Sequence, residues 1–130
     1  MPVTYEHEFD VRFRDCDAFG HVNNAVYLTY LEQARVEAWH RLTGTTGLPR
    51  NIILARVEID YRAPATLGDR LLVRLRTVAV GTKSFTLDCD IENVRTRATV
   101  ATARTVQVMY DYALGKSIAI PPDIRARLEG

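Results

Sequence analysis

The sequence predicts an α+β fold in which a five-stranded antiparallel sheet packs against one long helix. Three observations support this prediction. The chain has 130 residues, 47% hydrophobic and 25% charged, which is typical of one globular domain spanning residues 1–130. One segment has the period of an amphipathic helix over roughly five turns. Five other segments have the apolar character of strands, and most of them alternate apolar and polar residues.

The first predicted strand covers residues 3–13. Its apolar face is formed by Val3, Tyr5, Phe9, Val11 and Phe13, and His7 is the only polar residue on that face. Such alternation indicates a half-buried strand. The pattern stops after Phe13, and Phe19-Gly20 predicts a turn.

The predicted helix runs from about residue 25 to residue 42. Its apolar stripe recurs every three or four positions and consists of Tyr27, Leu31, Ala34, Ala38 and Leu42. Either Asn23 or Asn24 is a suitable N-cap, and Gly44 is a natural C-terminal stop.

Four further strands follow the helix. The first covers residues 52–61, the next two centre on residues 71–75 and 85–91, and the last covers residues 98–110. Gly81-Thr82 breaks the pattern between the middle two, so we expect a hairpin there. After Pro121-Pro122, residues 123–128 predict a short helical turn.

The single helix can cover only one face of such a sheet. The other face must meet solvent or a partner, and the long strands leave edges that proline does not protect. We therefore expect a homodimer or homotetramer.

Charge and hydropathy exclude several classes of protein. The formal net charge is +1 and the basic residues are dispersed, so nothing predicts a nucleic-acid partner. No apolar run approaches the ~20 residues that a membrane span requires. The N-terminus is acidic and alternating, unlike a targeting peptide. Two cysteines, Cys16 and Cys89, are too few for a disulfide scaffold, and a cytoplasmic location is expected.

Motifs for metals, flavins and nucleotides are missing from the sequence. There is no H-E-x-x-H, C-x-x-C, G-x-G-x-x-G or G-x-S-x-G motif, and Gly115-Lys116-Ser117 lacks the upstream glycine of a P-loop. We therefore expect no cofactor and no metal.

The segment before the helix carries the candidate chemistry. Asp15, Asp17 and His21 lie in a short loop that leads into the predicted helix N-terminus. Free amides and the helix dipole at that end can stabilise an oxyanion. A nearby carboxylate can activate water or attack an acyl carbon. Capping and solvation by the same residues are the simpler alternative.

A family resemblance strengthens the catalytic interpretation. The pattern D-x-D-x-x-G-H-V-N-N-x-x-Y-L from Asp15 to Leu28 resembles the signature of the 4-hydroxybenzoyl-CoA thioesterase family of hotdog proteins. The resemblance extends through the Gly81–Phe85 segment and the closing Val108–Asp111 segment, and so covers nearly the whole chain. The first motif is fairly specific, whereas the other two are weak alone.

The resemblance implies a hotdog fold with sites at a subunit interface. It implies hydrolysis of an acyl thioester, most simply acyl-CoA, with acyl carrier protein as another possible donor. Asp17 matches the family's catalytic aspartate, as general base or nucleophile. The amide near Asn24 would hold the thioester carbonyl, and Lys83 would meet the nucleotide end of CoA. The sequence at Ala18–His21 differs from that of the aromatic-substrate member, which favours a fatty or short acyl group.

Other roles remain open for the neighbouring residues. His21 either orients water or holds the loop. Asn23 either contacts substrate or caps the helix. Asp15 is expected to be structural, and Glu32 lies about 12 Å along the helix from Asn24, too far for the same site.

Three alternatives to an Asp17-dependent thioesterase follow from the same sequence. A Cys16–His21 nucleophile pair lacks a third orienting group and has acids on both sides. A hydratase or dehydratase of the same fold would leave the thioester intact. A non-catalytic acyl-thioester binding protein would not depend on Asp17 for turnover.

Overall fold

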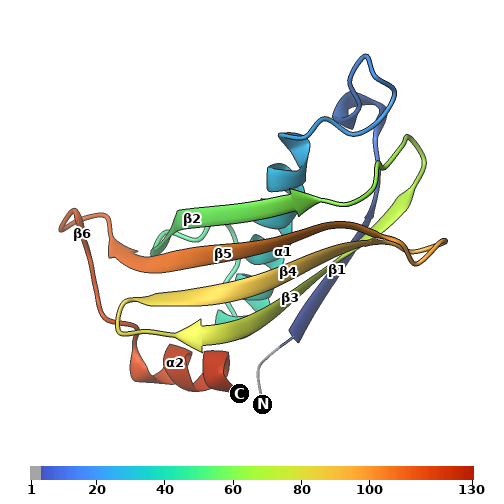
Figure 1. Cartoon of the computed structure of the whole chain (residues 1–130). Coiled ribbons are helices and arrows are strands. Elements are labelled where there is room, and N and C mark those ends of the chain that lie inside the picture. The colour runs from blue at the N-terminus through green and yellow to red at the C-terminus, as the bar shows by residue number, and fades with distance from the viewer. Residues whose placement is uncertain (1–3) are drawn as a thin grey trace.

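The computed structural model describes residues 4–130 and has the predicted antiparallel sheet and long helix (Figure 1). The sheet order is β1-β3-β4-β5-β2, and a short sixth strand, β6 (Lys116–Ser117), pairs with β5. The main strands are β1 (Thr4–Asp10), β2 (Ile52–Tyr61), β3 (Arg70–Val80), β4 (Ser84–Asn93) and β5 (Thr99–Asp111). Val3, the first position of the predicted opening strand, lies outside the described residues, so a domain spanning residues 1–130 stays a prediction.

The helix α1 (Val26–Thr43) packs its predicted stripe against the sheet. All five residues of that stripe are buried, and Tyr30 and Trp39 widen the buried surface. The facing strands contribute buried side chains at alternate positions, among them Leu71, Val73 and Leu75 of β3. The core therefore lies between α1 and one face of the sheet, as the alternation predicts.

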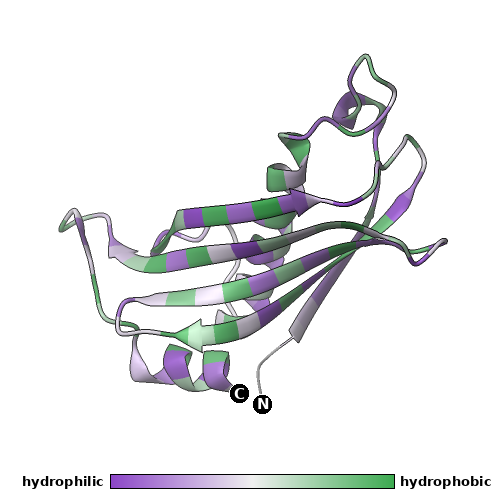
Figure 2. Cartoon of the chain, in the orientation of Figure 1, coloured by the Kyte–Doolittle hydropathy of each residue, from purple (hydrophilic) through white to green (hydrophobic). Residues whose placement is uncertain are grey.

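The outer face of the sheet is charged. Arg74 of β3 pairs with Glu92 of β4 at 2.6 Å, and Arg104 of β5 pairs with Asp88 of β4 at 2.7 Å. Along most strands, apolar and polar residues alternate, as Figure 2 shows. Because these ion pairs join neighbouring strands, they stabilise the pairing register of β3, β4 and β5 on the solvent-exposed face of the sheet.

The first predicted strand is wrong at its end. β1 stops at Asp10, residues Phe13–Asp15 form a short 3-10 helix (η1), and the Phe13 side chain is 82% exposed. The backbone N–H of Arg12 donates to the Asp15 carboxylate at 3.0 Å, which closes this turn locally. A local hydrogen bond thus overrides an alternation that continues in the sequence.

The start of the helix differs slightly from the prediction. The N-cap position is Ala25 rather than Asn23 or Asn24, and the Ala25 side chain makes no cap. Asn23 instead accepts a hydrogen bond from the Ala25 N–H at 2.9 Å, in a turn just before the helix. The predicted stop at Gly44 is confirmed, with φ +71° and its N–H donated to the His40 carbonyl.

The predicted C-terminal turn is an eight-residue helix, α2 (Pro122–Glu129). It buries Ile124 and Leu128, and Arg127 donates to the Leu42 carbonyl at 2.7 Å at the end of α1. This contact satisfies one of the unpaired carbonyls of the helix C-terminus. Within residues 4–130, neither helix has the length and apolar character needed to span a membrane.

Candidate active site

The loop between η1 and α1 is a small hairpin that projects Asp17. The Asp17 N–H donates to the His21 carbonyl at 3.1 Å, and the Gly20 N–H donates to the Asp17 carbonyl at 3.0 Å. Gly20 has φ +88°, a left-handed conformation that glycine adopts without strain. The Val22 N–H bonds to the Ala65 carbonyl at 2.8 Å, which anchors the loop to the segment between β2 and β3.

The Asp17 carboxylate is half-buried and oriented by two donors. The Phe19 N–H donates to Oδ1 at 2.9 Å, and the Asn23 side-chain amide donates to Oδ2 at 3.2 Å. An ionised carboxylate has about four lone-pair sites, so these bonds leave each oxygen able to accept another proton or donor. The geometry is that of an aligned carboxylate with free acceptor capacity.

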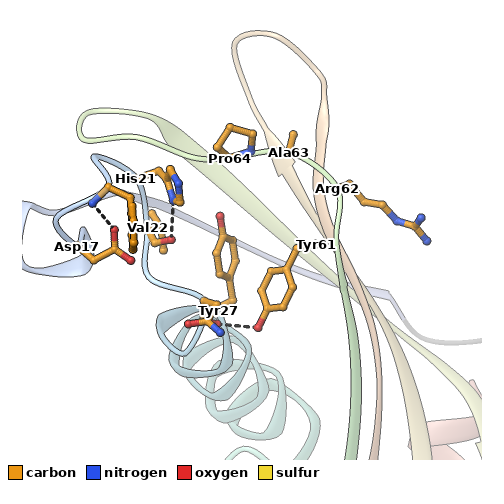
Figure 3. A pocket seen from close by; sticks show the side chains of 10 residues that line it. Asp17, His21, Val22, Tyr27, Tyr61, Arg62, Ala63 and Pro64 are labelled. Carbon is orange, nitrogen blue, oxygen red and sulfur yellow. Dashed lines mark hydrogen bonds between the residues drawn. The ribbon is translucent and has the colours of Figure 1, made fainter.

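A cleft of about 460 Å³ opens between this loop, the start of α1 and the end of β2. Figure 3 shows the side chains around it, with Asp17 and His21 on one side and Tyr61 on the other. Its lining is formed by Asp17, Phe19, His21, Val22, Asn24, Tyr27, Tyr61, Arg62, Ala63 and Pro64. The cleft thus combines one carboxylate with largely apolar and aromatic walls.

The segment entering α1 carries an unbonded backbone amide at Asn24, a residue that lines this cleft. The N–H groups of Ala25 and Val26 both bond to Asn23, through its side chain and its carbonyl. Within the part of the chain that the structure describes, the Asn24 N–H forms no hydrogen bond. It therefore provides an unused donor beside the positive end of an 18-residue helix.

His21 and Asn23 flank the carboxylate in different ways. The His21 ring lines the cleft, with Nδ1 3.4 Å from the Val22 carbonyl and its plane stacked on Phe19. Asn23 does not line the cleft but connects Asp17 to the helix entry. Its expected contact with substrate therefore stays a prediction, whereas its contact with Asp17 was not foreseen.

Lys83 lies away from the cleft within one chain. It is exposed in the turn between β3 and β4, at the end of the sheet opposite the Asp17 loop (Figure 1). Its carbonyl accepts the Met109 N–H at 2.8 Å. One chain alone does not bring Lys83 to Asp17.

Two other sequence candidates also lie outside the cleft lining. Glu32 is exposed on α1, and the Cys16 thiol faces the Arg12 carbonyl at 3.8 Å. Among residues 4–130, no group of three or more His, Cys, Asp and Glu side chains could hold a metal ion.

Sequence reasoning missed the two tyrosines of the cleft, Tyr27 and Tyr61. The sequence pattern places Tyr27 in the apolar stripe of the predicted helix and Tyr61 at the end of the predicted strand 52–61, and it predicts a site role for neither. Their rings meet edge-on with centroids 5.3 Å apart. No local pattern distinguishes a tyrosine whose ring fills the core from one that lines a cleft, so tertiary structure was needed.

An antiparallel sheet packed on one long helix is the hotdog architecture, which solved thioesterases share with this chain. Residues 11–128 match the thioesterase-like superfamily, and the chain belongs to this family. It is accordingly a thioester hydrolase.

Individual proteins agree with this assignment. The chain is 31% identical to the long-chain acyl-CoA thioesterase FadM of Escherichia coli K12, over 94% of this chain and 95% of that protein. It is 27% identical to a 1,4-dihydroxy-2-naphthoyl-CoA hydrolase of Synechococcus elongatus, over 96% and 95% of the two chains. A thioesterase of Thermus thermophilus, solved with coenzyme A and Zn, superposes with a TM-score of 0.84 at 34% identity and covers 96% and 91%.

Proposed function

We propose that this protein hydrolyses acyl-CoA thioesters to the free acid and CoA, with Asp17 as the catalytic carboxylate. The observation that carries the proposal is that Asp17 and Asn24 line the same cleft, and that the Asn24 N–H forms no hydrogen bond within residues 4–130. Thioester hydrolysis requires both a group that activates or replaces water and a donor for the carbonyl oxygen. The similarity to FadM over nearly the full chain supports acyl-CoA as the substrate class.

Asp17 has two possible roles in this reaction. As general base it takes a proton from water while the water oxygen attacks the thioester carbon. The tetrahedral intermediate then expels CoA thiolate, which regains the proton from Asp17. As nucleophile a carboxylate oxygen displaces CoA thiolate directly and forms a mixed anhydride, which water hydrolyses. A single turnover in ¹⁸O-labelled water tests the nucleophilic path, because label enters Asp17 itself when water attacks the aspartyl carbon of the anhydride.

The Asn24 amide is the proposed oxyanion donor. Charge develops on the carbonyl oxygen as the tetrahedral intermediate forms, and the end of the α1 dipole favours negative charge at that point. His21, on the same wall of the cleft, orients the attacking water in this proposal. Asn23 keeps the carboxylate facing the cleft through its 3.2 Å bond to Oδ2.

The acyl group is proposed to be an aliphatic chain. Val22, Tyr27, Tyr61 and Pro64 provide an apolar wall beside the reacting groups. FadM is named for long-chain acyl-CoA and the Synechococcus relative for 1,4-dihydroxy-2-naphthoyl-CoA, so relatives of similar sequence identity are named for different acyl groups. Acyl carrier protein as the thiol donor is the second possibility to be assayed.

A homodimer through β2 is the proposed assembly. β2 is an edge strand that pairs only with β5 among the described strands, and its inward-facing Val57 and Ile59 remain only half-buried. A second copy added antiparallel along β2 would continue the sheet and cover this strip. Light scattering should then give a mass above the 14.7 kDa monomer at micromolar concentration. A monomer under those conditions contradicts the assembly.

This assembly would also account for Lys83. The Lys83 carbonyl bonds to Met109, which is the register partner of Ile52 at the first residue of β2. In an antiparallel β2 pair, the first residues of one strand lie beside the last residues of the other. The partner's Lys83 would thus approach the cleft at Tyr61, where the CoA nucleotide would emerge.

A panel of acyl-CoAs assayed for release of free thiol tests the proposed function. We expect turnover with at least one chain length in the panel, with no added cofactor. A hydratase would add water to an enoyl-CoA and release no thiol, and a binding protein would retain the thioester. Failure of every acyl-CoA and acyl-carrier-protein thioester to release thiol would reject the proposal. A cytoplasmic location stays a prediction, which cell fractionation would test.

A further inference from the structure

A buried carboxylate lies two residues before Asp17 in the same loop, outside the lining of the cleft. Asp15 is 3% exposed, and it is the one acidic residue of the described chain that is buried. The Tyr30 hydroxyl donates to its Oδ2 at 2.8 Å, and the Arg12 N–H donates to the same oxygen at 3.0 Å. The Arg12 guanidinium reaches Oδ1 at 3.2 Å. The carboxylate is therefore paired on both oxygens.

The ionisation of this group favours a persistent hydrogen bond. Burial alone would raise the pKa of Asp15, but the donors from Arg12 and Tyr30 outweigh it and lower the pKa. Burial, followed by the bond to Asp15, raises the pKa of Tyr30. Near neutral pH, Asp15 is thus an ionised acceptor and Tyr30 a protonated donor.

Backbone bonds connect this pair to the reacting groups. The Asp15 carbonyl accepts the Asn23 N–H at 2.9 Å. Asn23 in turn donates to Asp17 Oδ2 at 3.2 Å and accepts the Ala25 N–H at 2.9 Å. Asp15 is therefore fixed to α1 through Tyr30, and it holds the residue that sets both the Asp17 carboxylate and the entry to the helix.

We propose that Asp15 and Tyr30 are positioning residues, which hold Asp17 at a fixed place relative to the Asn24 amide. The proposal rests on the proposed function. Tyr30 lies in α1, whose start presents that amide, whereas Asp15 lies in the loop that carries Asp17. The 2.8 Å bond between them connects the loop to the helix, and neither residue lines the cleft. A loosened loop would move the carboxylate relative to the carbonyl, and displacements of about 1 Å can cost up to ~10²-fold in rate.

Tyr30→Phe is the direct test, because it removes one hydroxyl and keeps the ring in the core. We expect kcat for an acyl-CoA to fall about 10-fold, and KM to stay within about twofold, since neither residue lines the cleft. Tyr5→Phe is the matched control, because Tyr5 lies outside the cleft lining and its hydroxyl forms no hydrogen bond within the described chain. Both are measured at a temperature where circular dichroism shows the variants folded. An unchanged kcat in folded Tyr30→Phe overturns the inference.

Asp15→Asn is the second variant, and it supplies the answer if Tyr30→Phe does not fold. It keeps the side-chain shape and removes the charge, and we expect a loss of kcat similar to that of Tyr30→Phe. The kcat of the double variant should be no lower than that of the more impaired single variant, because both substitutions remove the same Asp15–Tyr30 hydrogen bond. A double variant whose fold-loss in kcat is the product of the two single fold-losses would overturn the inference.

A positioning role also predicts how these variants combine with loss of Asp17. Adding Tyr30→Phe to Asp17→Asn should lower the residual kcat no further, since the carboxylate to be positioned is gone. A further 10-fold loss in that background would show that Tyr30 acts independently of Asp17. If the wild-type protein releases no thiol from any thioester, the proposed function fails. If the wild type is active and folded Tyr30→Phe equals it, only the present inference fails.

Discussion

The Tyr61 hydroxyl donates a hydrogen bond of 2.8 Å to the backbone carbonyl of Asn24. It joins the last residue of β2 to Asn24, which lines the cleft and whose N–H has no hydrogen-bond partner among the described residues. Tyr61 lies 37 residues beyond Asn24 in the chain, so this contact exists only once the sheet has formed against the helix. It holds the helix entry from the side opposite the Asp17 loop.

Tyr61→Phe should therefore weaken catalysis moderately. A hydrogen bond of this kind contributes about 0.5–1.5 kcal/mol, so we expect kcat/KM for an acyl-CoA to fall roughly 2- to 10-fold. Steady-state kinetics of Tyr61→Phe beside Tyr5→Phe would measure this loss. Equal kinetics for the two variants would show that the Tyr61 bond does not support the site.

Asp17→Asn should remain folded and lose about 10² to 10⁴ in kcat, the usual contribution of positioned acid–base catalysis. The amide preserves the size of the carboxylate but cannot accept a proton from water. Asp88→Asn, on the outer face of the sheet, is the matched control for loss of a carboxylate. Wild-type thiol release by folded Asp17→Asn would reject the mechanism.

Cys16→Ser should leave activity nearly unchanged, because the Cys16 thiol does not line the cleft. Burial raises the pKa of Cys89 to about 11, so its thiol stays protonated and unreactive at pH 8. Iodoacetamide at pH 8 should therefore modify Cys16 before Cys89 in the folded protein, as peptide mass spectrometry can show. Loss of activity in both Cys16→Ser and the alkylated wild type, with the fold intact, would make Cys16 the better nucleophile candidate.

Asp15→Asn should change how stability depends on pH. The pKa of Asp15 is lower in the folded chain than the ~3.9 of an unfolded aspartate, so its ionised form stabilises the fold above that pH. This stabilisation is lost as pH falls from about 4 through the folded pKa. Urea unfolding at pH 7 and pH 3 should show a smaller acid-induced loss of stability in Asp15→Asn than in the wild type. Parallel losses in both proteins would show that Asp15 is not responsible.

Lys83→Ala should raise KM for an acyl-CoA a few-fold and leave kcat nearly unchanged. An exposed phosphate contact is worth about 0.5–1 kcal/mol and acts equally on bound substrate and transition state. The defect should shrink with added salt, which screens the wild-type contact. It should vanish with an acyl-pantetheine, which lacks the nucleotide. An equal rise in KM for the full-length and truncated thioesters would show that Lys83 does not contact the CoA nucleotide.

Sequence periodicity was sufficient to predict the layers of this fold. The stripe from Tyr27 to Leu42 and the alternation in β3 and β4 reflect burial against a single core, and the structure confirms them. The end of β1 was predicted wrongly because the hydrogen bond of Arg12 to Asp15 is local and does not alter the apolar pattern. Hydropathy carries no signal for such a turn.

The site was only partly predictable for a different reason. Asp17, His21 and Asn24 lie close in sequence, so one loop places all three on the cleft. Tyr30 bonds to Asp15, 15 residues earlier in the chain, and Tyr61 bonds to Asn24, 37 residues earlier. Both contacts depend on the packing of α1 against the sheet. Lys83 depends on a second chain for any role at Asp17.

The strand order has a consequence for the rate at which the chain folds. β3, β4 and β5 are consecutive hairpin partners, whereas β1 pairs with β3 across about 66 residues, as Glu8↔Leu72 and Glu6↔Arg74 show. β2 likewise pairs with a strand distant in sequence, β5, as the pairing of Ile59 with Ala103 shows. Closing such a long loop costs conformational entropy before the strand contacts that offset this cost can form. We therefore expect the β3–β5 meander to form early and folding to take milliseconds to seconds, with the Asp17 loop reaching its final geometry among the last elements.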